Sequence, residues 1–467
     1  MPGIYTVLTI DEALGRIEGI DAQGGSPAPA GRVIARLLRE HRAVSVVRES
    51  EYLDRDYLRA YTSFYGTFFR RPSKYVERFH FFAEPITDDQ LDLRLPQDTY
   101  LGFCVLWPTD PTVIGRSLLR PPTGPGHRSL LVPRTAVHIG GCELFVDAPP
   151  YATKDFGVAA CASVATWLAT ELGAGLHNLP RSSSSDITLL AAPASSDMGR
   201  PLPQRFGLTT TEIMRALHSL GYEPFVYDLT SERFAARGTI YGYLASNIPL
   251  ILMVTLPGRE PDATDRHALL AVGYDFDFAQ ADREKRNAAG LTHLIVHDDR
   301  HGPYVLGRLD TAPASLPTIE LHYVTGTATA VVHQIVVPLP PKIYTISQEA
   351  HIHGQSFLGL ISGSADPDSE PVPLHWPFMV RTRLVEVTSL KRESRQWTQE
   401  GPSFDLRSQS LPRRVWLSEA ISKPLTVDSP VLGRVVIDPS VLRDATASRY
   451  LWAHWENTIF DVRSPGA

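Results

Sequence analysis

The sequence predicts an α+β protein built from more than one domain. Its 467 residues are enough for two to four domains at roughly 150 residues each. Apolar residues make up 43% and charged residues 21%, which is typical of a globular chain and excludes an intrinsically disordered one. Segments with helical spacing and strand-like runs both occur in the amino-terminal region and again in the middle of the chain.

Charge and cysteine content exclude several further classes. The net charge is −6 and no block of five or more like charges occurs, so we expect no nucleic-acid partner. Three cysteines cannot form a disulfide framework. The first twenty residues lack a basic start followed by an apolar core, and the longest apolar stretches are about half the length that spans a bilayer. We therefore expect a cytoplasmic protein without a membrane partner.

The amino-terminal region, residues 1–145, mixes helices and strands. Apolar spacing predicts a helix over residues 31–41 and another over residues 53–69, with a short strand between them. A small sheet should follow, made of the strand-like runs 75–82, 101–108, 135–141 and 142–148.

The middle region, residues 146–340, begins with predicted helices. Ala-rich residues 161–175 predict a helix that ends at Gly173 or Gly175. Residues 208–222 predict another, with a capping box between Thr209 and Glu212 and with Gly221 just past its end. Residues 180–206, between these helices, are polar and rich in Ser and Pro, so we expect a loop that serves as a mobile lid.

Strands dominate the rest of the middle region. A short helix at residues 239–247 precedes them, and residues 279–290 should form a charged hairpin tip. The predicted strands are 249–256, 267–277, 292–299 and 304–309.

The carboxy-terminal region, residues 341–467, follows a Pro-rich, linker-like segment. It is rich in turns and contains a few strand-like runs, so we expect a mainly β region. His351 and His353 lie two residues apart, which predicts a polar strand there.

Cys161 is the first candidate for chemistry because it stands at the start of the predicted helix 161–175. A helix amino terminus offers free N–H groups and a positive partial charge, and both favour the nucleophilic thiolate. A small core residue is the alternative interpretation. Cys104 and Cys142 lie within apolar strand patterns and are predicted to be inert.

His267 and Asp298 complete a candidate triad. His267 is predicted at the first position of an apolar strand, and Asp298 at the end of the next strand. If the two strands form a hairpin, the carboxylate lies beside the imidazole and can orient it. Asp299 should point to the other face of the strand.

These residues and their order resemble the papain-like cysteine peptidase superfamily, most closely its bacteriocin-processing, double-glycine-cleaving branch. The similarity covers roughly residues 150 to 310. It implies a core in which the nucleophile helix packs on an antiparallel sheet. It also implies Cys161 as nucleophile, His267 as general base, Asp298 as orienting acid, and a protein or peptide substrate without a cofactor.

One position departs from that family. Its members usually have Gln six residues before the Cys, where the amide helps to bind the oxyanion, and this chain has Asp155 there. A carboxylate would repel an oxyanion. If the protein is active, we expect Asp155 to cap the helix start, with Lys154, Thr153 or backbone N–H groups binding the oxyanion.

A metal site is the main competing interpretation of the histidines. His293 and His297 would lie about 13 Å apart on one strand face, at ~3.3 Å per residue, too far to share an ion. We therefore predict no metal. Asp298, Asp299 and His301 belong to the same cluster of possible metal ligands as these two histidines.

The preferred function is a cysteine-dependent hydrolase that cleaves a peptide or isopeptide bond. Two alternatives stay open: a transglutaminase-like acyl transferase, and a non-catalytic binding or scaffold protein that retains the fold. The sequence does not indicate the substrate, the oligomeric state or the role of the flanking regions.

Overall fold

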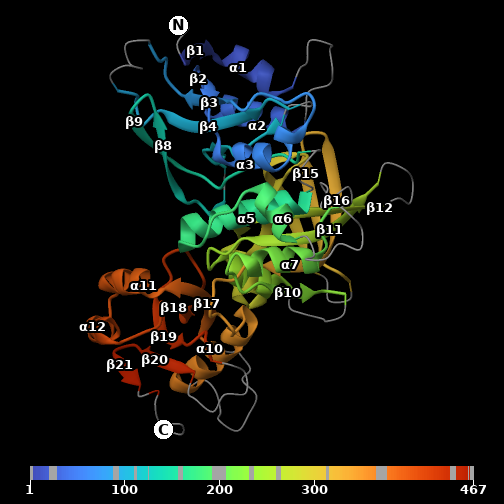
Figure 1. Ribbon diagram of the computed structural model, residues 1–467. Coiled ribbons are helices and arrows are strands. Elements are labelled where there is room, and N and C mark those ends of the chain that lie inside the picture. Colours follow the sequence, from blue (N-terminus) through green and yellow to red (C-terminus); the bar gives the residue numbers. More distant parts are fainter. Residues whose placement is uncertain are drawn as a thin grey trace. The chain divides into compact units, whose positions relative to one another are not determined.

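A computed structural model describes most of the chain (Figure 1). The described residues are 4–19, 29–87, 94–109, 113–124, 126–155, 161–191, 207–230, 236–258, 264–311, 315–363, 376–441, 449–460 and 462. The chain divides into two compact units. The first comprises residues 1–232, 248–274 and 293–340, and the second comprises 233–247, 275–292 and 341–467. The three-region division at residues 145 and 340 stays a prediction.

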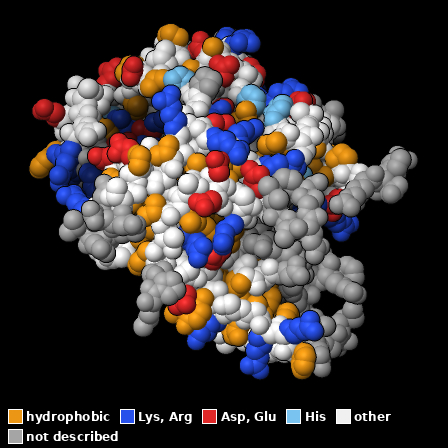
Figure 2. Space-filling model, turned by 90° about the horizontal axis from the view of Figure 1, so that it is seen from above, with side chains coloured by type: hydrophobic (Ala, Val, Ile, Leu, Met, Phe, Trp, Pro, Cys, Tyr) orange, Lys and Arg blue, Asp and Glu red, His pale blue; other side chains and the backbone are white. Residues whose placement is uncertain are grey.

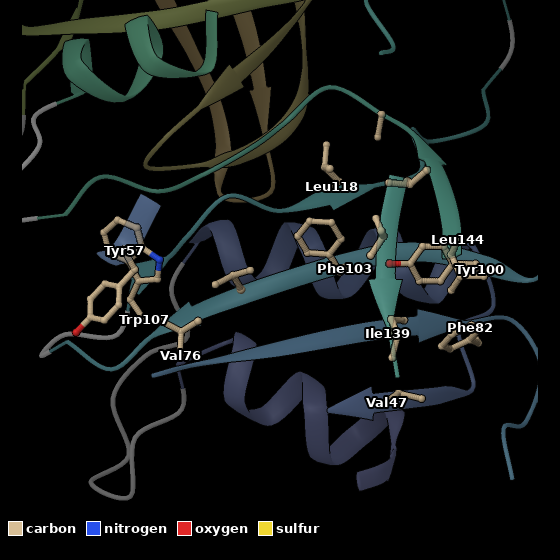
Figure 3. Packing of buried hydrophobic residues seen from close by; sticks show 14 of the residues in the cluster. Val47, Tyr57, Val76, Phe82, Tyr100, Phe103, Trp107, Leu118, Ile139 and Leu144 are labelled. Carbon is tan, nitrogen blue, oxygen red and sulfur yellow. The ribbon is translucent and has the colours of Figure 1, made fainter. Parts of the chain in front are cut away.

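The first unit begins with an antiparallel sheet in the order β1-β2-β3-β4-β5, with β6 also paired to β4. Strand alternation sends successive side chains to opposite faces. Val46 of β2 packs with α1 and α2, whereas its neighbour Val47 packs with α3 and the β8–β9 hairpin. Figure 3 shows part of the hydrophobic core that contains Val47, together with Phe103 and Leu144. The elements are β1 (Tyr5–Thr9), α1 (Ile10–Ile17), α2 (Pro29–Glu40), β2 (Ser45–Tyr52), α3 (Arg55–Ser63), η1 (Tyr65–Thr67), β3 (Val76–Phe82), β4 (Tyr100–Trp107), β5 (Val113–Ile114), β6 (Leu118–Leu119), β8 (Arg134–Ile139) and β9 (Cys142–Asp147).

A second sheet of the first unit has the order β10-β16-β11-β12-β13-β14-β15. Because β16 also pairs with β15, the strands from β11 to β16 close on themselves, and β7 pairs with β12. Helix α5 contacts β11, α6 and α7. The strands are β7 (His127–Leu130), β10 (Phe225–Asp228), β11 (Leu250–Pro257), β12 (Thr264–Phe276), β13 (Leu291–Asp298), β14 (Gly302–Asp310), β15 (Thr318–Tyr323) and β16 (Gly326–Val337), and the helices are α5 (Cys161–His177), α6 (Ser184–Ala191) and α7 (Thr210–Ser219).

Helix α5 is also tied to the amino-terminal part of the same unit. The guanidinium of Arg55 reaches Glu171 of α5 at 3.0 Å and the carbonyl of Ser182 at 3.2 Å. Arg116 adds a second cation 3.7 Å from Glu171. Since Glu171 is buried, these two arginines compensate a charge that would otherwise destabilise the helix packing. The amino-terminal part therefore helps to position α5.

The second unit contains a five-stranded sheet in the order β17-β18-β19-β20-β21. Helix α10 contacts β17, β18 and β19, and α8 contacts α10 and β17. Gly354 of α10 permits this approach, because a Cβ there would lie 1.9 Å from Oγ of Ser418. The elements are α8 (Ala236–Leu244), α9 (Phe278–Glu284), η2 (Asn287–Gly290), α10 (Ser347–Ile361), β17 (Phe378–Glu386), α11 (Val387–Glu393), η4 (Ser394–Gln396), α12 (Glu400–Ser408), β18 (Arg414–Ser422), β19 (Val431–Ile437), β20 (Tyr450–Trp455) and β21 (Thr458–Phe460).

The predicted α+β class is confirmed at this coarse level. The capping box of α7 is also confirmed, since Thr209 and Glu212 exchange hydrogen bonds and Gly221 has φ +83°. On the face seen in Figure 2, acidic, basic and apolar side chains are interspersed. None of the helices within the described ranges is long and apolar enough to cross a membrane.

Outside the candidate site, three local predictions are wrong and a fourth is wrong over the part that the structure describes. The residues around His351 and His353 form helix α10 rather than a strand, and residues 279–290 hold α9 and η2 rather than a simple hairpin tip. Helix α5 continues past both glycines to His177, and Asn178 with φ 51° follows it. Gly173 and Gly175 instead allow close packing, because a Cβ would lie 2.7 Å from the Tyr222 hydroxyl or 2.5 Å from Pro133.

The fourth concerns the predicted lid. Its first half is helix α6 with buried serines before and within it, Ser182, Ser183, Ser184 and Ser185. Ser183 caps the helix start through Asp186, and Ser182 Oγ lies 2.6 Å from Thr170 Oγ1 of α5. Satisfied hydroxyls can be buried, so a Ser-rich run need not be a surface loop. Residues 192–206 lie outside the described part of the chain.

Candidate active site

Three elements of the first unit carry the candidate triad. Cys161 is the first described residue of α5 and is half-buried. His267 lies on β12, opposite Val254 of β11, and Asp298 is the last residue of β13. β12 begins at Thr264, so the prediction of His267 as the first strand residue is wrong. The pairing with β11 extends three residues farther than the apolar pattern suggests, through Arg266 and Asp265.

The imidazole of His267 is fully buried and bound to Asp298. Its Nε2 lies 3.0 Å from Oδ1 of that carboxylate. Its Nδ1 has no partner of hydrogen-bond geometry among the described residues. The side chain of Cys161 nevertheless interacts with the ring. Because Nε2 is engaged by Asp298, Nδ1 is the nitrogen left for the thiol.

The carboxylate of Asp298 is held by four donors. Besides His267, Oδ1 accepts the backbone N–H of Arg300 at 2.9 Å. Oδ2 accepts the hydroxyl of Tyr323 at 2.8 Å and pairs with Nδ1 of His301 at 3.1 Å. Burial alone would raise the pKa of Asp298, but the hydrogen bonds from His267 and His301 hold it well below its usual range. The carboxylate is therefore charged and fixed in orientation.

That charge determines the state of His267. Burial lowers the pKa of the imidazole, but the hydrogen bond to Asp298, the Cys161 side chain and the nearby carboxylates raise it to about 10. The ring is thus an imidazolium at neutral pH, ready to stabilise a thiolate and to donate a proton.

Asp299 also faces the imidazole, contrary to the prediction that it points away. Its Oδ1 lies 3.5 Å from Nε2 of His267. Strict alternation fails because β13 ends at Asp298 after a register shift, and Asp299 lies in the following turn. Burial, together with the charge of Asp298, raises the pKa of Asp299 to about 6 despite the opposing effect of His267. Neither carboxylate oxygen has a hydrogen-bond partner among the described residues.

Two cations lie near the candidate triad. Burial alone would lower the pKa of the Arg300 guanidinium, but its hydrogen bond to Asp265 and the charges of Asp265, Cys161 and Asp299 raise it. The charge of Lys154 acts on Asp265 and Asp299. Arg300 therefore contributes positive potential at Cys161, and Lys154 contributes it beside the two carboxylates.

The residues expected at the oxyanion position are engaged differently. Asp155 is buried and its carboxylate accepts a hydrogen bond from the hydroxyl of Tyr65. Thr153 is bound to the backbone of Ile114, accepting its N–H at 3.0 Å and donating to its carbonyl. The hydroxyl of Thr153, one of the possible oxyanion donors, is therefore already engaged. The predicted cap by Asp155 involves residues 156–160, which lie outside the described part.

A small cavity of about 10 Å³ lies against Cys161 and is lined by Tyr151, Ala268, His297 and Asp299, among others. It has room for about one water molecule. Nδ1 of His297 pairs with the carbonyl of Pro150 at 3.0 Å, and burial lowers the pKa of this ring to about 3. The neutral ring therefore donates through Nδ1 and leaves Nε2 as an acceptor, without a partner among the described residues.

His267, Asp298 and Asp299 could also hold a metal ion, since their ligand atoms lie within 4.8 Å of one another. This group differs from the histidine cluster weighed from the sequence. The donor set fits a cation poorly, however, because both oxygens of Asp298 already accept hydrogen bonds and an imidazolium carries no free lone pair at Nε2. The charges of Lys154 and Arg300 also oppose a cation here.

Sequence reasoning assigned no role at the triad to four contributors: Asp299, Arg300, His301 and Tyr323. The polar density of the turn at residues 298–301 was a usable signal for the first three. No sequence signal pointed to Tyr323, because this residue reaches Asp298 from β15, 25 residues away. No protein-family model matches this chain, and a search of curated proteins finds no match either.

Proposed function

We propose that the protein is a cysteine-dependent hydrolase with a papain-like core, acting on a peptide or isopeptide bond through Cys161, His267 and Asp298. One observation carries the proposal. His267 is bound through Nε2 to a charged, fully buried Asp298, and this leaves Nδ1 for the Cys161 thiol. A nucleophile, a base and an orienting acid in this order are the parts that acyl transfer needs.

The first half of the reaction forms an acyl-enzyme. The Cys161 thiolate attacks the scissile carbonyl carbon and a C–S bond forms while the carbonyl oxygen becomes an oxyanion. The oxyanion collapses, the C–N bond breaks, and the leaving amine takes the proton from Nδ1 of His267. Asp298 keeps the ring oriented and stabilises its charge in the steps before that transfer.

The second half releases the acid. Nδ1 of His267, now neutral, accepts a proton from water as the water oxygen attacks the thioester carbonyl. The C–S bond then breaks and the thiolate is restored beside the imidazolium. Arg300 stabilises the thiolate both before the attack and after its release, because the charge of the guanidinium acts on the sulfur of Cys161.

Two further observations support the proposal. Asp155 is engaged by Tyr65, so its carboxylate has a partner of its own and need not oppose the oxyanion. In this proposal the oxyanion is bound by backbone N–H groups, including that of Cys161. Helix α5 packs against β11 of an antiparallel sheet, as expected for a papain-like core.

The test compares the three cysteines within one protein. Iodoacetamide, followed by peptide mapping, should label Cys161 first, and the half-buried Cys142 of β9 much more slowly. Cys104 is buried and its pKa is raised to about 12, so it should not react. His267→Ala should slow labelling of Cys161, whereas His218→Ala, an exposed histidine of α7, should not.

Turnover is then measured on a reactive acyl ester and on peptides with a fluorogenic amide. Cys161→Ala should abolish both activities and Cys142→Ala neither. Labelling of Cys161 no faster than that of Cys142 would contradict the proposal and favour a non-catalytic protein. Diversion of the acyl group to an added amine, at the expense of hydrolysis, would favour an acyl transferase instead.

A further inference from the structure

The segment between α3 and β3, residues 64–75, exposes aromatic and basic side chains, and we refer to it as the aromatic loop. Phe69 is fully exposed to solvent and Phe68 is 45% exposed. Residues 57–75 contain four cations and no acidic residue, although the chain as a whole has a net charge of −6. The loop is therefore a basic and apolar surface on an acidic protein. Its exposed cations are Arg70, Arg71 and Lys74.

Tyrosine hydroxyls fix the aromatic loop at both ends. Tyr65 is buried, and its hydroxyl donates to the carboxylate of Asp155. The ring of Phe68 lies edge-on to the ring of Tyr65, with 5.4 Å between the centroids. At the other end, the hydroxyl of Tyr57 donates to the carbonyl of Ser73 at 2.7 Å. A loop held in this way loses little conformational entropy when it binds, so its exposed side chains form a preorganised contact surface.

The two arginines beside Phe69 are not used within the chain. Neither Arg70 nor Arg71 forms a hydrogen bond, ion pair or ring contact with any residue that the structure describes. Lys74 lies over the ring of its neighbour Tyr75, 5.3 Å from the centroid. The guanidinium groups are therefore available to carboxylates of a partner, and such groups recognise carboxylates through two parallel hydrogen bonds.

The aromatic loop is joined to the candidate active site through Asp155. This residue precedes Cys161 by six positions, so the two Cα atoms are at most about 22 Å apart. Its neighbour Lys154 acts electrostatically on Asp299, whose carboxylate lies 3.5 Å from His267. An extended peptide held at the triad therefore reaches the aromatic loop within about fourteen residues.

We propose that the aromatic loop is a docking surface for the substrate, and that it selects a peptide in which apolar residues lie next to acidic ones. The inference rests on the proposed function, because it names the substrate class of that site. Phe68 and Phe69 would cover the apolar residues, and Arg70 and Arg71 would bind the carboxylates. An anionic lipid surface has a similar chemistry, but the connection through Asp155 to the triad favours the substrate.

Fluorescence anisotropy measures docking without turnover. The protein is the full chain with Cys161→Ala, and the probes are labelled peptides of about sixteen residues with Leu-Phe-Glu-Asp-Glu at either end. These acidic peptides should bind, and binding should weaken as ionic strength rises. Phe69→Ser should weaken it about five-fold or more, and the double change Arg70→Glu with Arg71→Glu about ten-fold or more.

Charge reversal on both sides separates recognition from a folding defect. A peptide with Lys in place of each acidic residue should bind the protein with Arg70→Glu and Arg71→Glu about ten-fold more tightly than it binds the unchanged loop. Matched controls come from the second unit and should leave binding of the acidic peptides unchanged. They are Phe404→Ser on α12, which is 69% exposed, and Arg392→Glu with Arg395→Glu, both exposed on α11 and η4.

In the protein with Cys161 intact, the same loop substitutions should raise KM for hydrolysis of the acidic peptides and leave kcat within about two-fold. Loop-dependent binding without turnover would count against the hydrolase and support the docking surface, whereas turnover that is insensitive to the loop substitutions would do the reverse. Equal binding of the acidic and the Lys-containing peptides would overturn the proposal. So would Phe69-dependent binding to vesicles of equal parts phosphatidylserine and phosphatidylcholine without binding of the peptides, which would identify a membrane surface instead.

Discussion

The imidazole of His267 and the carboxylate of Asp298 form a fully buried pair, with Nε2 and Oδ1 3.0 Å apart. They come from adjacent strands, β12 and β13, and the pair is surrounded by further donors to the same carboxylate. A buried carboxylate with four donors stays ionised, and it stabilises the imidazolium beside Cys161. The predictions below follow from this pair and from the packing of α5.

Asp298→Asn should lower kcat/KM by about 10³-fold or more, because the amide cannot stabilise the imidazolium and permits the wrong tautomer. The pKa of His267 should also fall from about 10 toward its ordinary value, since Asp298 supplies a hydrogen bond and a charge that raise it. NMR titration of the imidazole measures this shift independently of activity. Asp310→Asn, at the exposed end of β14, is the matched control and should leave both quantities unchanged.

Stability should depend on pH with a defined sign. The pKa of His267 is raised to about 10. The contribution of this group to the free energy of unfolding is therefore complete below about pH 6.5 and is lost as pH rises through 10. The pKa of Asp298 is lowered, so its contribution is present above about pH 4 and is lost as pH falls further.

Urea unfolding between pH 7 and 10.5 checks the alkaline limb. The free energy of unfolding should fall by at most about 5 kcal/mol in the wild type and by less in His267→Gln. Parallel pH curves for the two proteins would contradict the raised pKa. Hydrolysis should fall over the same alkaline range, because the neutral imidazole cannot protonate the leaving amine.

Asp299→Asn should stabilise the protein above pH 6. A buried carboxyl group whose pKa is raised to about 6 opposes folding once it ionises, so wild-type stability decreases as pH rises from about 4 through 6. The expected gain is roughly 1–3 kcal/mol at pH 7.5 and vanishes near pH 4. The charge of Asp299 also raises the pKa of His267, so the alkaline limb of activity should move to lower pH. A loss of stability at pH 7.5 would show that the carboxylate has a stabilising partner.

Gly173→Ala should destabilise the protein although alanine favours helices. A Cβ at this position would lie 2.7 Å from the Tyr222 hydroxyl, so α5 must shift or the tyrosine must move. We expect a loss of about 1–3 kcal/mol in denaturant unfolding. Gly15→Ala in α1 is the control: it meets nothing within 4 Å and should stabilise by up to about 1 kcal/mol. Equal effects of the two substitutions would contradict the packing of α5.

Local signals in the chain were sufficient where the partner groups are near in sequence. The capping box of α7 was predicted because Thr209 and Glu212 are three residues apart and bond each other. Cys161, His267 and Asp298 could be selected because their residue types and strand or helix positions suggested the chemistry. The apolar runs of β11, β12 and β13 likewise marked buried strands.

Prediction failed where the partners are remote. The four serines at 182–185 looked like a loop, but Thr170 and Arg55 satisfy polar groups of this segment and allow its burial. The segment around His351 looked like a strand, but Gly354 allows α10 to pack against Ser418 of β18. The end of α5 was predicted wrongly because its glycines allow Tyr222 and Pro133 to pack closely and do not end the helix.

The sequence by itself determined the α+β class, the main strands and helices, and the three residues of the candidate triad, because these depend on periodicity, caps and side-chain chemistry. Only the tertiary structure decided the environment of those residues. Tyr323 comes from β15, Asp299 turns back toward His267 after β13 ends, and Tyr65 of η1 engages Asp155. Burial and neighbouring charges set each pKa, and both arise from groups that the folded chain brings together from distant positions.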